Sequence, residues 1–223
     1  MKDEAFDFIT FDCYGTLIDW ESGIVNAFQS EAARDGLQLE PAAIVSAYNS
    51  EEPVVEAGEY RSYREVLAET AARVAALLGW KLERDRTRFL AASLPRWQPF
   101  PDTNPALERL ARRFKLGILS NVDADLLAET RRHFTVDFDL LITAQQVCSY
   151  KPAHNHFSTA LAHLEGKRLL HAAQSYFHDV VPCREIGLPV VWVNRKGLLT
   201  DASVPRMTYE VRNLTELADL LGA

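Results

Sequence analysis

Residues 105–221 alternate between helical segments and short apolar runs, and this alternation constrains the fold more strongly than any other feature of the chain. The helical segments are 105–113, 123–133, 153–164, 181–186 and 213–221, and the apolar runs are 116–119, 138–143, 169–173 and 189–193. Strands joined through helices run parallel, because each crossover returns the chain to the same end of the sheet. The alternation therefore predicts an α/β fold with a doubly wound, parallel, Rossmann-like sheet.

The N-terminal segment adds a further strand at residues 6–11. This run is apolar apart from Asp7 and Thr10, which is typical of a central strand that is covered on both faces. The strand delivers Asp12 into a tight turn. A carboxylate at the exit of a buried strand is costly unless it is paired or used in chemistry, so Asp12 is a candidate functional residue.

Residues 18–97 have a different character, because helical patterns recur there without a strand pattern between them. We expect helices at 22–35, 41–48, 59–78 and 83–93, and we expect Pro53 and Gly58 to interrupt the second. The segment from Pro95 to Pro105 carries four prolines, which is typical of a linker. We predict a small all-helical cap at 18–97, inserted after the first strand, and a Rossmann-like core formed by 1–17 and 98–223.

Composition limits the partners and the location. The net charge of −7 over 223 residues disfavours a nucleic-acid or anionic-membrane partner, although a small anionic substrate is still possible. The three cysteines have no paired spacing, which argues against a disulfide framework or a zinc site. No N-terminal signal region and no apolar run of membrane-spanning length is evident, so we expect a cytoplasmic enzyme or binding protein.

Polar side chains follow several predicted strands at the edge where parallel sheets bind ligands. Asp12 follows the first strand, Ser120 and Asn121 follow the 116–119 strand, Lys151 lies in the loop after the 138–143 strand, and Asp179 begins a helix after the fourth. Taken singly, each has an ordinary structural explanation as a turn residue, a helix cap or a solvated charge. Together they predict a catalytic site.

These four segments resemble the sequence motifs of the haloacid dehalogenase superfamily. The matching stretches are Asp-Cys-Tyr-Gly-Thr at 12–16, Leu-Ser-Asn at 119–121, Tyr-Lys-Pro at 150–152 and, imperfectly, Gln-Ser-Tyr-Phe-His-Asp at 174–179. The resemblance implies that Asp12 is a nucleophile. In the phosphatase branch a second Asp protonates the leaving group and acids hold Mg²⁺, whereas the 2-haloacid dehalogenase branch attacks carbon, needs no metal, and has a Tyr two places after the nucleophile.

Tyr14 and Gln174 both depart from the phosphatase pattern. Tyr14 replaces the general acid, and Gln174 falls where a metal-ligating Asp would be expected. The cluster of Asp12, Asp179 and Lys151 carries a net charge of −1, so one lysine can largely balance it without a cation. Halide leaves as a stable anion without needing a proton. We therefore favour metal-independent hydrolysis of a small carboxylate substrate, a 2-haloacid, with no cofactor.

By this resemblance Asp12 forms an aspartyl ester, Lys151 and Thr16 orient its carboxylate, and Asp179 activates or orients the hydrolytic water. The predicted substrate-binding residues are Tyr14, Ser120, Asn121, Cys13, Gln174 and Tyr176. Among these, strand alternation points the Cys13 side chain away from the nucleophile, so we give it no catalytic role.

The chain also departs from the dehalogenase pattern. Asn49 falls where family members carry an Arg that helps bind the leaving halide, and Arg61 or Arg64 could substitute for it from the next helix. Phe157 stands in place of a family Tyr. A different small carboxylate, a fluorinated acid or a lost activity is therefore open, as are a Mg²⁺-dependent phosphatase and a non-catalytic binding relative. A homodimer is expected from the resemblance alone.

Overall fold

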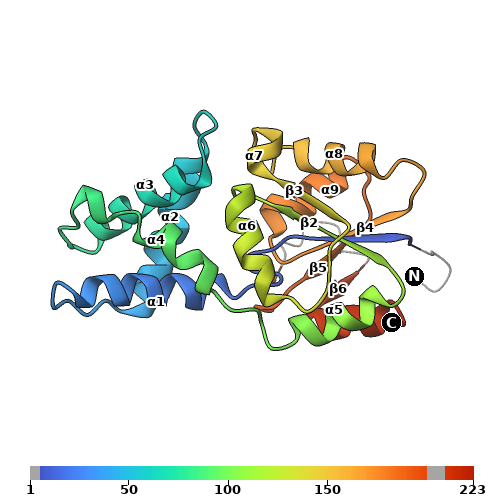
Figure 1. The fold of residues 1–223 in the computed structure, drawn as a ribbon, viewed down its shortest axis with the longest axis horizontal. Helices are drawn as coiled ribbons and strands as arrows, with labels where there is room; N and C mark the ends of the chain where they lie inside the picture. Colours follow the sequence, from blue (N-terminus) through green and yellow to red (C-terminus); the bar gives the residue numbers. More distant parts are fainter. Residues whose placement is uncertain (1–5, 200–208) are drawn as a thin grey trace.

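The computed structural model describes residues 6–199 and 209–223. It consists of a parallel sheet between layers of helices, beside a separate group of helices (Figure 1). The sheet has six strands in the order β3-β2-β1-β4-β5-β6, and every neighbouring pair is parallel. The predicted α/β fold with a doubly wound parallel sheet is confirmed.

The strands are short and mostly buried. They are β1 (Phe8–Phe11), β2 (Lys115–Ser120), β3 (Leu140–Thr143), β4 (Leu169–Ala173), β5 (Val190–Val193) and β6 (Glu210–Val211), of which β6 is absent from the sequence prediction. β1 lies between β2 and β4 and all four of its residues are buried. Its side chains alternate between the two faces of the sheet, so that Phe8 contributes to one apolar cluster and Ile9 and Phe11 to the other.

Helices cover both faces of the sheet. They are α5 (Thr103–Ala111), α6 (Ala124–Thr130), α7 (Ala144–Val147), α8 (Asn155–His163), α9 (Val181–Glu185) and α10 (Leu214–Leu220). Figure 1 shows α7, α8 and α9 on one side of the strands and α5 on the other, where α5 packs against α10. Both faces of the sheet are therefore covered, and a ligand can approach it only at the strand ends.

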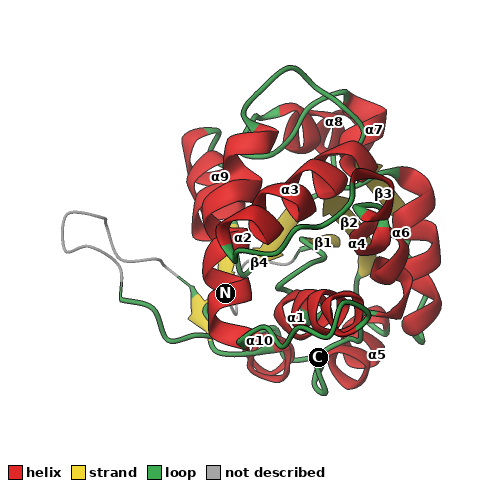
Figure 2. Cartoon of the chain, turned by 90° about the vertical axis from the view of Figure 1, so that its left-hand side faces the viewer, coloured by secondary structure: helices red, strands yellow, loops and turns green. Residues whose placement is uncertain are grey.

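The cap contains α1 (Trp20–Ala33), α2 (Pro41–Glu56), α3 (Tyr63–Leu77) and α4 (Phe89–Ser93), and no strand lies within the fully described range 20–93. Viewed from the cap side, these helices lie in front of the strand ends (Figure 2). One expectation is wrong: α2 continues through Pro53 to Glu56. A proline removes one backbone hydrogen bond, but α2 stays helical because Tyr48 and Val55, on either side of Pro53, are buried in the core. The predicted 83–93 helix is also broken, since only 89–93 is α-helical after a short 3₁₀ turn at 84–86.

Two crossing segments join the cap to the sheet. Ile18 pairs with Pro99 in an isolated antiparallel bridge, and the Thr103 hydroxyl donates to the Leu17 carbonyl at 2.8 Å. Farther out, both oxygens of the Asp123 carboxylate accept backbone N–H groups of α3, from Tyr63 at 2.9 Å and from Arg64 at 3.0 Å. Asp123 of the core thus satisfies free N–H groups at the start of α3, in addition to the local capping box of Ser62 and Glu65.

The boundaries of the cap at 18–97 and of the core at 1–17 and 98–223 stay a prediction.

Among the helices that the structure describes, none has the length and apolar character required to cross a bilayer.

Gly23 in α1 gives a test of how the cap is seated. A Cβ built at Gly23 would lie 2.3 Å from Cγ of the buried Trp97. Gly→Ala in a helix interior ordinarily stabilises by about 1 kcal/mol. Here we expect Gly23→Ala to destabilise by about 1–3 kcal/mol because of overpacking, measured by urea unfolding. Combining it with Trp97→Leu should remove most of the penalty, and a stabilised single variant would contradict the packing described.

Candidate active site

Asp12 lies at the carboxyl end of β1, where its backbone N–H still bonds to the Ala172 carbonyl at 3.1 Å. The chain then turns through Gly15, whose φ of +97° is strained for any other residue. This turn brings Thr16 back, and its hydroxyl donates to Asp12 Oδ2 at 2.8 Å. Asp12 is only 7% exposed, and burial raises the pKa of its carboxyl above its ordinary value, against the opposing effect of Lys151.

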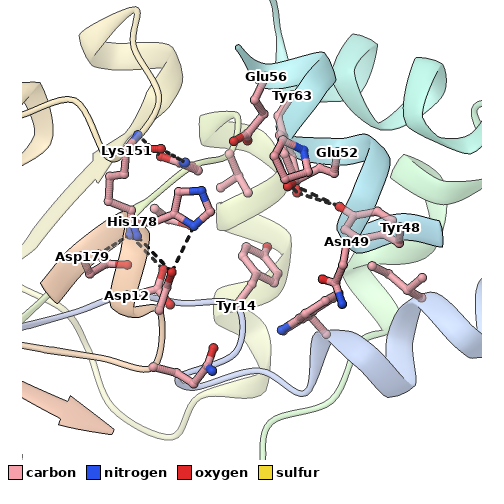
Figure 3. A pocket seen from close by; sticks show the side chains of 18 of the residues that line it. Asp12, Tyr14, Tyr48, Asn49, Glu52, Glu56, Tyr63, Lys151, His178 and Asp179 are labelled. Atoms are coloured by element: carbon pink, nitrogen blue, oxygen red, sulfur yellow. Dashed lines mark hydrogen bonds and ion pairs between the residues drawn. The ribbon is translucent and has the colours of Figure 1, made fainter. Parts of the chain in front are cut away.

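Lys151 is the centre of the site (Figure 3). Its buried ammonium donates to Asp12 Oδ1 at 2.9 Å, to Asp179 Oδ1 at 2.6 Å and to the Leu119 carbonyl at 3.0 Å. These bonds use all three donors of the ammonium group. Burial alone would lower the pKa of Lys151, but the charges of Asp12 and Asp179 outweigh it and raise the pKa above its usual range. The lysine is therefore a fixed cation shared by two carboxylates.

Asn121 holds the loop that carries Lys151. The Lys151 backbone N–H donates to Asn121 Oδ1 at 2.7 Å, and Asn121 Nδ2 donates to the Lys151 carbonyl at 3.0 Å. Asn121 also lines the cavity described below. Its amide is thus already engaged in positioning the lysine, a role that the sequence analysis does not assign to it.

Asp179 has a second partner that sequence reasoning missed. His171 on β4 lies beside Thr10 on β1, and its ring bridges the Thr10 hydroxyl at 2.9 Å and Asp179 Oδ1 at 3.0 Å. Burial would raise the pKa of Asp179, but Lys151 and then His171 outweigh it and lower the pKa to about 2. Asp179 lies within a π-helical turn, Tyr176–Val180, rather than at the start of a helix as expected. In the sequence, the sign of this contact is one polar residue in each of two otherwise apolar strands, Thr10 in β1 and His171 in β4.

A cavity of about 270 Å³ opens in front of Asp12, between the strand ends and the cap. The core contributes Asp12, Ser120, Asn121, Lys151, Gln174 and Asp179, and the cap contributes Trp20, Tyr48, Asn49, Glu52, Glu56 and Tyr63. Within the described chain, three residues that line it have an enclosed polar atom without a hydrogen-bond partner: Ser120 Oγ, Asp179 Oδ2 and Glu56 Oε1. Buried polar atoms are rarely left unsatisfied, so the cavity is built to receive a polar ligand.

Tyr14 forms one wall of the cavity. Its hydroxyl bonds to the Thr130 hydroxyl at 2.7 Å, and its ring meets Trp97 edge to face at 5.8 Å between centroids. Burial raises the pKa of Tyr14 well above its ordinary value. The residue is therefore a poor proton donor and presents an aromatic surface to the ligand.

Two residues that the sequence analysis assigns to substrate binding do not line the cavity. Cys13 is fully buried in the apolar core, as strand alternation suggests. Tyr176 packs edge to face on Trp192, with 5.1 Å between ring centroids. Gln174 does line the cavity, and its backbone N–H donates to the Thr16 hydroxyl at 2.8 Å.

Neither candidate arginine reaches the cavity. Arg61 binds Glu69 at 2.7 Å and the Val55 carbonyl at 3.3 Å, and Arg64 pairs with Asp125. Asn49 does line the cavity wall. Phe157 is fully buried and packs against His171 below the site. Lys196 also lines the cavity, but it forms an ion pair with Glu21.

The donor set does not fit a magnesium site. Mg²⁺ prefers carboxylate oxygens in octahedral geometry. Here both Asp12 oxygens accept hydrogen bonds from Thr16 and Lys151, and an amide, Gln174, stands where a second carboxylate would be needed. No group of three or more His, Cys, Asp or Glu side chains in the described ranges is arranged to hold a metal ion.

Comparison with known proteins gives consistent relatives. A family model described as haloacid dehalogenase-like hydrolase matches residues 6–176. The chain is 30% identical to the (S)-2-haloacid dehalogenase H-109 of Pseudomonas putida over 227 residues, which cover 96% of each protein.

Two solved structures share the fold. An L-2-haloacid dehalogenase from Xanthobacter autotrophicus with chloropropionic acid covalently bound has a TM-score of 0.82 at 20% identity, over 98% of this chain and 99% of that chain. A defluorinating L-2-haloacid dehalogenase has a TM-score of 0.83 at 22% identity, over 98% of this chain and 96% of that chain. At these identities the structural likeness shows the fold alone.

Replacing Lys151 by Met tests the central bridge. The variant keeps the length of the side chain but leaves Asp12 and Asp179 buried together without a cation. Removing one partner of a buried ion pair costs about 3–5 kcal/mol, so we expect the free energy of unfolding in urea at pH 7 to fall by that amount. Adding Asp179→Asn should restore part of the loss. Equal stability of Lys151→Met and the wild type would contradict the bridge.

Proposed function

The chain belongs to the haloacid dehalogenase-like hydrolase family, and from this premise we propose that it hydrolyses the carbon–halogen bond of small (S)-2-haloacids. The observation that carries the proposal is the placement of Asp12, held by Lys151 and Thr16, in a cavity between the core and the cap whose lining includes unpartnered polar atoms. A buried, oriented carboxylate facing a ligand site is suited to covalent catalysis.

In the first step, a carboxylate oxygen of Asp12 attacks the carbon that bears the halogen. The new oxygen–carbon bond forms as the carbon–halogen bond breaks, and the halide leaves with the bonding electrons. Lys151 and Thr16 hold the carboxylate in place through their bonds to its two oxygens. Backside attack inverts the carbon, so an (S)-2-haloacid gives an (R)-configured ester.

In the second step, water attacks the carbonyl carbon of the aspartyl ester, and the bond from this carbon to the substrate oxygen breaks. One proton of the water passes to the 2-hydroxy acid, the other goes to solvent, and Asp12 is regenerated as a carboxylate. Asp179 Oδ2 lacks a partner and lines the cavity, so it can accept a hydrogen bond from this water. The pKa of Asp179, lowered to about 2, makes it a better acceptor for orienting water than a store for its proton. The second step breaks no bond at the chiral carbon, so the product keeps the inverted configuration.

For the substrate carboxylate, the proposed contact is the free Ser120 hydroxyl, since Asn121 is engaged with the Lys151 loop. Tyr14 and Trp20 form apolar walls around a small carbon chain. Three features support carbon chemistry over phosphate-ester chemistry: the high pKa of Tyr14, the amide at Gln174, and a lysine balancing the two acids. Metal independence is part of the proposal.

Two further expectations stay predictions. The first is a cytoplasmic location. The second is assembly as a homodimer, which light scattering of the purified protein would test.

A substrate panel tests the proposed function. We expect chloride release from (S)-2-chloropropionate, unaffected by EDTA, with (R)-lactate as the product on chiral chromatography. Asp12→Asn should reduce this activity by more than about 10³-fold, because it removes the nucleophile. Mg²⁺-dependent release of phosphate from small phosphate esters, without halide release, would contradict the proposal. Ligand-induced thermal stabilisation without turnover of any compound would instead indicate a binding protein.

A further inference from the structure

The cap wall of the cavity carries two carboxyl groups that the proposed mechanism does not use. Glu52 and Glu56 are one helical turn apart on α2, so they share a face, and both line the cavity. Figure 3 shows their side chains on the cap side of the space in front of Asp12 and Lys151. An acidic wall is unexpected in a site proposed to bind an anionic acid and release an anionic halide.

Glu52 is held in place by two tyrosines. The hydroxyl of Tyr63 donates to Glu52 Oε1 at 3.1 Å and that of Tyr48 at 3.5 Å, and the two hydroxyls lie 3.3 Å apart. Such donors favour the ionised form of Glu52. Even so, burial outweighs them and raises the pKa of Glu52 to about 7.

Glu56 is different, because its Oε1 is enclosed and has no hydrogen-bond partner in the described structure. The charged and titratable groups around it are Glu52 and Tyr48 on its own helix, Tyr63 on α3, and Tyr150 and Lys151 on the core loop. Lys151 is already shared between two aspartates, and the guanidinium of Arg61 is bound to Glu69. Burial and the charge of Glu52 raise the pKa of Glu56 well above its ordinary value.

Backside displacement fixes where the halide departs. The leaving group lies opposite the attacking oxygen, and Asp12 attacks from the core, so the halide leaves toward the cap. The described part of the cavity wall contains no arginine to receive it. A carboxylic acid that keeps its proton can replace a cation as hydrogen-bond donor.

We propose that the protonated carboxyl of Glu56 donates a hydrogen bond to the departing halide, and that Glu52, one turn away on α2, is a positioning residue for this donor. The inference rests on the proposed function. As the Asp12–carbon bond forms and the carbon–halogen bond breaks, the halide takes the bonding electrons and accepts a hydrogen bond from the Glu56 carboxyl, which keeps its proton. The halide then leaves the cavity as an anion. Fluoride is the most basic halide, so this donor benefits carbon–fluorine substrates most.

The pH profile of the wild type provides the first test. The donor must be protonated, so activity is present below the pKa of Glu56 and is lost as the pH rises through it. We expect kcat/KM for (S)-2-chloropropionate and (S)-2-fluoropropionate to fall above about pH 7, after Glu52 has ionised. A profile that stays flat from pH 6 to 10 would overturn the proposal, whether or not any variant folds.

Two glutamine variants test which residue causes the fall in kcat/KM above about pH 7, the alkaline limb of the profile. Glu56→Gln keeps the shape but cannot ionise, so it should lose the limb. Because an amide is a weaker hydrogen-bond donor than a carboxylic acid, it should lower kcat on the fluoro acid by about tenfold, and on the chloro acid by less. Glu52→Gln removes the negative charge that raises the pKa of Glu56, so the limb should move to lower pH. Glu51→Gln is the matched control, since Glu51 on the same helix pairs with Arg73 and does not line the cavity.

The outcomes separate this inference from the function beneath it. If Glu56→Gln releases chloride and fluoride with the wild-type ratio and pH profile, the assignment of Glu56 as hydrogen-bond donor is wrong and the dehalogenase function stands. If the wild type releases no halide from either acid, both proposals fall. A limb that moves equally in Glu51→Gln and Glu52→Gln would also contradict the specific role of Glu52.

Discussion

The site depends on one buried ammonium group shared between two carboxylates. Neither Asp12 nor Asp179 could be ionised at its depth without Lys151, because an uncompensated buried charge costs several kcal/mol. The lysine is held in turn by the Leu119 carbonyl at the end of β2 and by Asn121 through the backbone of its loop. Three strand ends are thereby tied together at the carboxyl edge of the sheet, and the nucleophile is oriented before any ligand arrives.

The cap completes what this edge cannot supply alone. Asp123 of the core holds the start of α3, and the bridge between Ile18 and Pro99 fixes the crossing chains. The face of α2 that results meets the cavity with Glu52 and Glu56. Enclosure strengthens every charge–charge interaction inside. Burial therefore leaves Asp179 ionised in direct contact with Lys151, but raises the pKa of Glu56, on which burial and Glu52 outweigh the effect of Lys151.

Sequence reasoning reached the sheet and the nucleophile because parallel strands deliver their carboxyl ends to one edge, which forces Asp12, Lys151 and Asp179 together. It missed His171, whose ring contacts Thr10 and Asp179 because of the register between β1 and β4. Strand register cannot be derived from the composition of the strands. The glutamates of α2 were missed for a related reason. Which face of a cap helix meets the cavity depends on tertiary packing, and α2 was also expected to end before Pro53.

The most direct test of the account is where an oxygen atom goes. In water enriched in ¹⁸O, a single turnover with excess enzyme and (S)-2-chloropropionate should give unlabelled lactate, because its new oxygen comes from Asp12. After that turnover, mass spectrometry of the peptide that contains Asp12 should find one ¹⁸O in its carboxyl group. Labelled lactate in the first turnover, with an unlabelled Asp12, would show direct attack by water and contradict the role of Asp12 as nucleophile.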